Sequence, residues 1–259
     1  MTVTAQRTMA IDTLYNMRDE RRALATIARG LQEEWGAFGP KDNSEMNRMV
    51  DGAGNRVYVG REVLDRQLGS PLIVLQTGVA DVKGEPHRLT EKHPTYCHIT
   101  SGETWTGFGE MKGDTALLLQ ITTLDEDARN NGIGSVFRGG VLSVLDDSIR
   151  WALTTTPVPR DFYDKLVSSA VPLEELEHGV LAFPPAVRFH YNGGGRIAGI
   201  SGNYKLPYAG REQLGCGRQS NTAVAFLRYS RAPDGKWTGI DTGARQMNIV
   251  GREMTVVRY

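Results

Sequence analysis

The sequence predicts one mixed α/β domain, with a central sheet flanked by helices, and three observations predict it. The most apolar run, DTALLLQITT at 114–123, has the length of a strand and is apolar enough to lie at the centre of a sheet. A glycine turn and a helix-type segment at 134–147 follow it directly. Strand-type and helix-type segments then alternate along the whole chain, in the order β-α-α-β-β-β-β-α-β-α-β-β.

The first half of the chain opens with a weakly alternating strand at 2–10. A helix over Ile11–Phe38, with a break near Asp19, is expected because Leu24, Ile27 and Leu31 recur at helical spacing. The remaining expectations in this half are a loop at 38–45, strands at 55–60 and 70–82, a loop at 81–94, and a hairpin of 95–100 with 104–111.

The second half is expected to alternate strands and helices after the central strand. A strand at 149–156 precedes a helix at 157–169, whose prolines suit a helix start. Further expectations are a short helix at 172–179, strands at 196–201 and 222–230, a turn at 231–237 and an edge strand at 253–259.

Composition excludes few functions. The 259 residues carry 30 basic and 30 acidic side chains, and no apolar run approaches the ~20 residues that a membrane span needs. The N-terminus lacks the apolar core of a signal peptide, and Cys97 and Cys216 lack metal-type spacing. We therefore expect a cytoplasmic protein with reduced thiols and without a metal. From Leu181 onward, however, 11 basic residues stand against 4 acidic ones, which indicates either solvated strand edges or an anionic partner.

The junction between the central strand and the next helix carries the strongest functional signal. It reads Arg129-Asn130-Asn131-Gly132-Ile133-Gly134-Ser135. A helix start has unpaired N–H groups and a partial positive charge that attract phosphate, and glycines let the backbone approach it closely. The alternative is a plain glycine turn. A dinucleotide-binding turn is disfavoured because only two glycines fit and no acid ends the next strand, and no Gly-Lys-Ser/Thr of a phosphate-binding NTPase loop is present.

This junction resembles the R/Q-x-x-G-x-G/A motif of the GNAT superfamily of acyltransferases. The resemblance implies that the loop and helix start bind the pyrophosphate of coenzyme A. It also implies that the preceding strand, at Ile121, Thr122 and Thr123, pairs its backbone with the pantetheine arm. In that family the strands beside the central opening splay apart, so the sheet is expected to be splayed there.

The stretches TWTGFGEMKGDTALLLQITTLDEDARNNGIGS, PAVRFHYNGGGRIAGISGNYKLP and LGCGRQSNTAVAFLRYS resemble the GNAT-like domains of polyketide-synthase loading modules. The resemblance covers Asn55–Ser230 and implies a single domain over 1–259. We expect a strand and helices at 1–54, the donor-binding core at 55–230 and a C-terminal extension at 231–259. The stretches FGPKDNSE and NYKLPYAGREQLG depart from the subfamily where substrate or carrier contacts are expected, which leaves the acyl acceptor open.

Four residues are candidates for the chemistry. His190 lies beside glycines and can act as acid, base or oxyanion donor, unless it is a satisfied core histidine. By resemblance, Thr155 or Thr156 is its partner, and strand alternation lets only one of the two face the cleft. Tyr163 matches the helix tyrosine that many GNAT enzymes use as acid toward the leaving thiolate, although a ring used only in packing is an equal alternative.

The function expected from these residues is acyl transfer from a thioester to a thiol or amine acceptor, with acyl-CoA decarboxylation as a further activity. The donor would be a coenzyme A ester or a phosphopantetheine thioester, and the partner an acyl-CoA or an acyl carrier protein. Two alternatives remain open at this stage. One is an aminoacyl-tRNA donor bound through the arginine-rich C-terminal half, and the other is CoA or partner binding without turnover.

Overall fold

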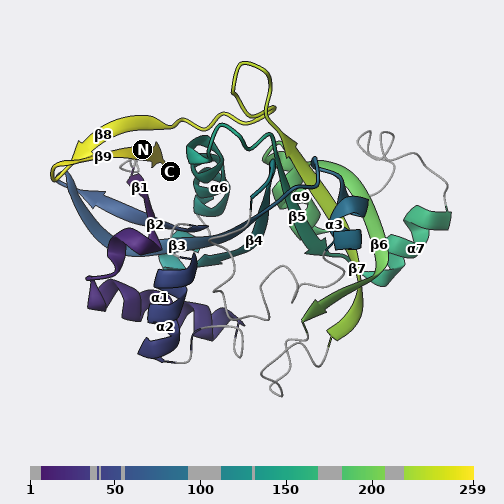
Figure 1. The fold of residues 1–259 in the computed structure, drawn as a ribbon, viewed down its shortest axis with the longest axis horizontal. Coiled ribbons are helices and arrows are strands. Elements are labelled where there is room, and N and C mark those ends of the chain that lie inside the picture. The colour runs from purple at the N-terminus through teal and green to yellow at the C-terminus, as the bar shows by residue number, and fades with distance from the viewer. Residues whose placement is uncertain are drawn as a thin grey trace, which may run out of the picture.

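The computed structural model contains a mixed α/β fold with one large sheet (Figure 1). The structure describes residues 7–35, 40, 42–53, 56–92, 112–129, 132–168, 183–207 and 219–259. Within these residues the sheet has nine strands in the order β6-β7-β5-β4-β3-β2-β1-β9-β8. The mixed sheet flanked by helices confirms the predicted fold class.

The strands differ in length and lie in a sheet whose order does not follow the chain. They are β1 (Thr8–Thr13), β2 (Val57–Leu64), β3 (Gln67–Ala80), β4 (Thr115–Thr123), β5 (Trp151–Pro157), β6 (Arg196–Pro207), β7 (Gln219–Ser230), β8 (Arg245–Ile249) and β9 (Arg252–Arg258). All neighbouring pairs among them are antiparallel except β4 and β5, which run parallel.

The helices follow the same chain order. After the 3₁₀ turn η1 (Leu14–Met17) come α1 (Arg21–Trp35), α2 (Asn43–Ala53), α3 (Pro86–Lys92), α5 (Glu126–Arg129), α6 (Ile133–Val144), α7 (Arg160–Ser168) and α9 (Pro185–Asn192). None of the helices in the described ranges is long and apolar enough to cross a membrane.

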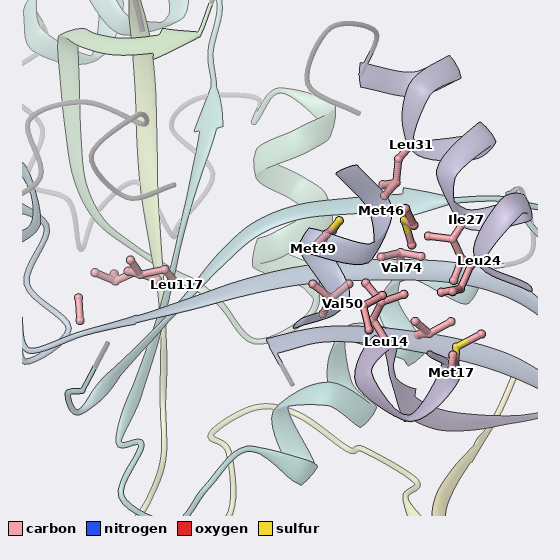
Figure 2. Packing of buried hydrophobic residues seen from close by; sticks show 14 of the residues in the cluster. Leu14, Met17, Leu24, Ile27, Leu31, Met46, Met49, Val50, Val74 and Leu117 are labelled. Carbon is pink, nitrogen blue, oxygen red and sulfur yellow. The ribbon is translucent and has the colours of Figure 1, made fainter. Parts of the chain in front are cut away.

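Helices cover both faces of the sheet. Figure 1 shows α6 on one face and α1 with α2 on the other. The neighbouring β4 residues Leu117 and Leu118 belong to separate buried clusters, because side chains alternate across a strand. Leu117 lies in the cluster with α1 and α2, whose side chains point toward the strand carrying Val74 in Figure 2, and Leu118 lies in the cluster with α6.

The C-terminal segment covers α6 on the side away from the sheet. Trp237 is buried and its Nε1 donates a hydrogen bond of 2.6 Å to the carbonyl of Leu142. A Cβ added to Gly139 would lie 3.4 Å from Ile240, so this segment packs directly on the helix. β9 then pairs with β1, which places the chain's last strands beside its first. α6 is therefore buried between the sheet and the chain's own extension.

The helix predicted to begin at Ile11 is wrong over its first residues. Residues Thr8–Thr13 form β1, Leu14–Met17 form the 3₁₀ turn, and α1 starts only at Arg21, after the expected break. The reason is non-local. β1 takes its backbone hydrogen bonds from β2 and β9, which lie far away in the sequence and leave no mark on the local pattern.

Besides the short α5, three helices lie in segments for which no helix was predicted. Asp42 accepts a hydrogen bond from the Glu45 N–H at 2.8 Å and begins α2, where a loop was expected until 45. Pro86 begins α3 inside the loop expected at 81–94, and Pro185 begins α9, to which no element was assigned.

The strand β9, predicted as an edge strand, is not at the edge of the sheet, because β8 pairs along its outer side. The predicted hairpin at 95–111 and the helix at 172–179 fall outside the described residues.

Candidate active site

The parallel strands β4 and β5 part at the centre of the sheet. Their pairing runs from Thr115 and Trp151 to Leu118 and Thr154, and beyond that point β4 pairs within the described residues only with β3, and β5 only with β7. The register between β3 and β4 steps from Leu118 to Gln120, so Leu119 is a bulge residue at the point of separation. The sheet is splayed at its central strands, as the family resemblance implied.

Beyond Leu118, the edge of β4 that faces the separation has no strand partner among the described residues. Leu124 donates its N–H to Leu72 at 2.7 Å, and residues opposite one another in an antiparallel pair alternate between bonded and unbonded. The backbone groups of Thr122 therefore face β3, and those of Ile121 and Thr123 face the opening. Of the three positions predicted for the donor's arm, two present their backbone on the open side.

A cavity of about 160 Å³ lies where the strands part. Its lining comes from β3, β4, α6, β5 and α9, and it consists of Leu75, Leu118, Leu119, Gln120, Ile121, Arg138, Thr154, Thr155, Thr156, Pro157, Phe189 and His190. The structure therefore brings His190 and both predicted threonines to one cavity, next to the predicted donor strand.

The start of α6 opens beside this cavity. Gly132 precedes the helix with φ of 73°, in the left-handed region that favours glycine, and a Cβ built on it meets no described atom within 4 Å. A Cβ on Gly134 would lie 3.4 Å from the Phe189 ring and 4.0 Å from Ile121 Cδ1, both of which line the cavity. The N–H groups of the first helical turn thus point to a place adjacent to the open strand edge. Asn130 and Asn131 lie outside the described residues.

Arg129 lies at the end of α5, between the strand and the helix start. Its guanidinium is 3.3 Å from Glu34 of α1 and 3.3 Å from the carbonyl oxygen of Thr123. The side chains of Arg129 and Glu34 are 54% and 44% exposed, so this ion pair is solvated and adds little stability. Arg129 is close to the predicted phosphate position and is held by a contact that an anion can replace.

His190 lies in the last turn of α9 and is tied to β7. Its Nδ1 is 2.8 Å from the hydroxyl of Tyr229, a buried residue. Burial, together with the positive charge of Arg138, lowers the pKa of His190 from 6.5 to about 3. Burial also raises the pKa of the Tyr229 phenol. The imidazole is therefore uncharged at neutral pH, and the phenol keeps its proton.

Arg138 is a charge buried inside an otherwise apolar helix. Its guanidinium donates to the carbonyl of Phe189 at 3.0 Å and lies 4.4 Å above the Phe189 ring. Its Nε has no hydrogen-bond partner among the described residues, and burial lowers its pKa. A Cβ on Gly193 would overlap this guanidinium, so only glycine fits there.

The threonines of β5 point to alternate faces. Thr154 and Thr156 are opposite Leu227 and Ala225 of β7, which pack with Val187 of α9, so these two hydroxyls share the face that carries His190. Thr155 is opposite Phe226, which packs in the cluster of α1 and α2. Of the two candidates, Thr156 is the one on the histidine's side.

Tyr163 of α7 lies apart from these groups. Its ring packs against β6, where a Cβ on Gly202 would lie 2.7 Å from the ring, and Arg160 lies 4.9 Å above it. It is absent from the described lining of the cavity. The structure does not bring Tyr163 together with His190 and Thr156, and its ring has a packing role.

Sequence reasoning missed Arg138 and Tyr229. Arg138 had a detectable signal, since it is a single charge in the helix IGSVFRGGVLSV. Tyr229 had none, because an aromatic residue in AFLRYS is ordinary in a buried strand. Both residues acquire a role only through contacts across more than 35 positions of sequence, as the hydrogen bonds 39 and 51 residues apart show.

The protein is similar in structure to several GNAT-type domains. The GphF GNAT-like decarboxylase in complex with isobutyryl-CoA is 18% identical, with 85% of this chain and 98% of that chain covered and a TM-score of 0.49. The loading GNATL domain of CurA from Lyngbya majuscula is 17% identical, with 86% and 97% covered and a TM-score of 0.48. The aminoglycoside acetyltransferase AAC(6')-Ib in complex with coenzyme A and kanamycin is 11% identical, with 86% and 95% covered and a TM-score of 0.44.

These solved structures are domains of the kind that the sequence motifs resemble. No protein-family model matches the chain, and no curated protein matches it.

Proposed function

We propose that this protein is an acyltransferase of GNAT type, which moves an acyl group from a thioester donor to a thiol or amine acceptor. One observation carries the proposal. β4 leaves β5 at a cavity and continues as a free strand edge toward an open helix start, so an extended thioester has a place for each of its parts.

The donor's arm would lie along β4 with its phosphates at α6. From Leu119 to Thr123 the strand edge spans about 13 Å at ~3.3 Å per residue. Backbone groups of Ile121 and Thr123 face this path, and they suit the amides of a pantetheine arm. The pyrophosphate would accept hydrogen bonds from the first-turn N–H groups of Ile133 and Gly134, with Arg129 beside it. A coenzyme A ester and a carrier-bound phosphopantetheine thioester share this arm and its phosphate.

The reacting carbonyl would lie in the cavity between the strands. The acceptor's thiol or amine attacks the carbonyl carbon, and the carbonyl oxygen becomes an oxyanion in the tetrahedral intermediate. Hydrogen bonds from His190 and Thr156 would stabilise that charge. Collapse of the intermediate breaks the C–S bond, the acceptor loses its proton, and the donor's thiolate leaves and takes up a proton in its place.

One of the C-terminal arginines is not available to an aminoacyl-tRNA donor. Arg231 binds the carbonyl oxygens of Leu145 and Asp146 at 3.0 and 3.1 Å and is therefore occupied inside the molecule. Arg196 lies 4.8 Å above the Tyr191 ring. Arg211 and Arg218 fall outside the described residues.

The donor site is tested with a matched pair of glycine variants. Gly132 and Gly251 both have positive φ, at 73° and 79°, and a Cβ on either meets nothing described within 4 Å. Valine at the two positions therefore imposes similar backbone strain, but only Gly132 adjoins the predicted phosphate position. In titration calorimetry with a coenzyme A ester, Gly132→Val should weaken binding by about tenfold or more, the size of one or two lost charge-assisted hydrogen bonds. Gly251→Val should bind like the wild type.

Turnover is tested by incubating the protein with a panel of acyl-CoA esters and acyl carrier proteins, each with candidate acceptors. The intact mass of every acceptor then identifies both acceptor and acyl group. Equal binding by the two glycine variants, or the absence of acylated acceptor and of free thiol with every donor, would refute the proposal.

A further inference from the structure

Tyr229, His190 and Arg138 form a buried set at the inner side of the cavity. They come from β7, α9 and α6, and the hydrogen bond and ring contacts between them lie across 39 to 91 positions of sequence. Tyr229 is fully buried and Arg138 is 2% exposed, so neither side chain exchanges its partners freely with water. The two residues therefore help to fix the surroundings of His190, and Arg138 also lines the cavity.

The direction of the hydrogen bond between Tyr229 and His190 follows from the other acceptors nearby. The Tyr229 hydroxyl is 2.8 Å from His190 Nδ1 and 3.4 Å from the His190 carbonyl oxygen. That carbonyl oxygen already accepts the N–H groups of Gly193 and Gly195, at 3.1 and 3.0 Å. A carbonyl oxygen has two lone pairs, so the phenol's proton goes to Nδ1, which is also the nearer atom. In a neutral imidazole whose Nδ1 accepts, the proton sits on Nε2.

Burial is the main reason that the pKa of His190 is lowered, and the positive charge of Arg138 adds to it. The Arg138 guanidinium is anchored on the carbonyl of Phe189 and lies 5.6 Å above the ring of Tyr229. An arginine remains charged in proteins, and no carboxylate among the described residues offsets this one. A second positive charge on the adjacent imidazole is therefore disfavoured.

Among the described residues, the titratable groups that face His190 are Tyr229 of β7 and Arg138 of α6, while β5 contributes threonines that do not titrate. Arg188 and Tyr191 lie on the same helix as His190, and Arg188 is exposed to solvent.

We propose that Tyr229 and Arg138 are positioning residues that hold His190 as an uncharged Nε2–H tautomer, so that it donates a hydrogen bond to the reacting carbonyl and does not act as a general base. The proposal rests on the proposed function for the identity of that carbonyl. It also requires that the proton of the attacking thiol or amine leaves by another route, because the accepting nitrogen of His190 is already engaged.

The tautomer is measured without any substrate. Two-bond ¹H–¹⁵N spectra of the imidazole rings distinguish Nε2–H, Nδ1–H and charged histidine. The chain has five histidines, and the signals of His190 are those missing in His190→Ala. The wild-type protein should show an uncharged Nε2–H ring for His190 from pH 8 to pH 5. An Nδ1–H ring, or titration near pH 6.5, would overturn the proposal.

Two variants test the roles of Tyr229 and Arg138 one at a time. Tyr229→Phe removes the hydroxyl alone, so Nδ1 loses its donor. We expect its ¹⁵N shift to move and kcat to fall about tenfold, the cost of one hydrogen bond, with an unchanged KM for the donor. Arg138→Met removes the charge, so the titration of His190 should move up toward 6.5. An unchanged kcat in Tyr229→Phe, or an unchanged titration in Arg138→Met, would overturn the role given to that residue.

Tyr204 provides the matched control. It is also a buried tyrosine, and its hydroxyl has no hydrogen-bond partner among the described residues. Tyr204→Phe should leave both the His190 spectrum and kcat unchanged. If the wild type transfers acyl groups but shows an Nδ1–H ring, only this inference fails. If the Nε2–H ring is found and no donor gives any transfer, the proposed function fails, and with it the part played by these residues in acyl transfer.

Discussion

The two ends of helix α6 are treated in opposite ways. At its C-terminal end, Arg231 donates to the carbonyl oxygens of Leu145 and Asp146, and Trp237 donates to that of Leu142. At its N-terminal end, a Cβ built on Gly132 meets no described atom within 4 Å. The chain thus supplies its own cation to the negative end of the helix dipole and leaves the positive end accessible. The C-terminal end is thus stabilised by the chain's own side chains, and the N-terminal end is the place that we propose for the phosphates of an anionic ligand.

The largest expected effect is a loss of stability at the C-terminal end of α6. Trp237→Ala removes a buried indole and its hydrogen bond to Leu142, and it should lower the free energy of unfolding by about 3–5 kcal/mol. Urea denaturation measures this loss, and calorimetry should find the affinity for a coenzyme A ester unchanged at a temperature where the variant is folded. A loss of affinity without a loss of stability would show that the C-terminal segment belongs to the donor site.

At the N-terminal end of α6, beside the cavity, the expected loss is in turnover. His190→Ala removes the proposed oxyanion donor, and such groups contribute a factor of ~10²–10⁴ to the rate. We expect kcat to fall by at least about a hundredfold while the fold and the donor affinity persist. Circular dichroism and calorimetry verify those two conditions. Near-normal turnover in this variant would exclude His190 from the chemistry and leave the backbone of β4 as the main source of stabilisation.

The buried imidazole also predicts a pH dependence of stability. In the unfolded chain His190 binds a proton below its ordinary pKa of 6.5, but in the folded protein its pKa is lowered to about 3. The unfolded state therefore binds more protons between these values, and stability falls as the pH is lowered through that window. From pH 7 to pH 5 the loss should be about 1–2 kcal/mol.

Urea denaturation of the wild type and His190→Gln at the two pH values isolates this contribution. The variant should lose less stability between pH 7 and pH 5 than the wild type. An identical loss in both proteins would mean that His190 is not held uncharged by its surroundings.

The smallest effect distinguishes two neighbouring hydroxyls. Thr156→Val should lower kcat by about three- to tenfold, because one hydrogen bond to the oxyanion is lost. Thr155→Val is the matched control, since it makes the same change on the opposite face of β5. Steady-state kinetics of the two variants gives the comparison. A larger loss for Thr155→Val would reverse the assignment of faces.

The sequence alone determined the central strand, the helix after it and the glycine junction between them. These features are encoded locally. The run at Thr115–Thr123 has five apolar residues among its nine, Gly132 stands where the backbone needs positive φ, and α6 begins at the next residue. The mixed α/β class follows from the alternation of strand-type and helix-type segments along the chain. A strand, a turn and a helix that follow one another in the chain need no distant contact to be recognised.

Only the tertiary structure decided which side chains meet at the cavity. Because side chains alternate along a strand, the sequence predicted that Thr155 and Thr156 face opposite ways. The pairing of β5 with β7 and the packing of α9 determined which of them shares a face with His190. The packing of Tyr163 on Gly202 was likewise invisible in the sequence. The hydrogen bond between His190 and Tyr229 joins residues 39 positions apart, and the lowered pKa of His190 comes from burial and from the charge of Arg138. Such contacts join elements far apart in the chain, and a local pattern carries no record of its distant partner.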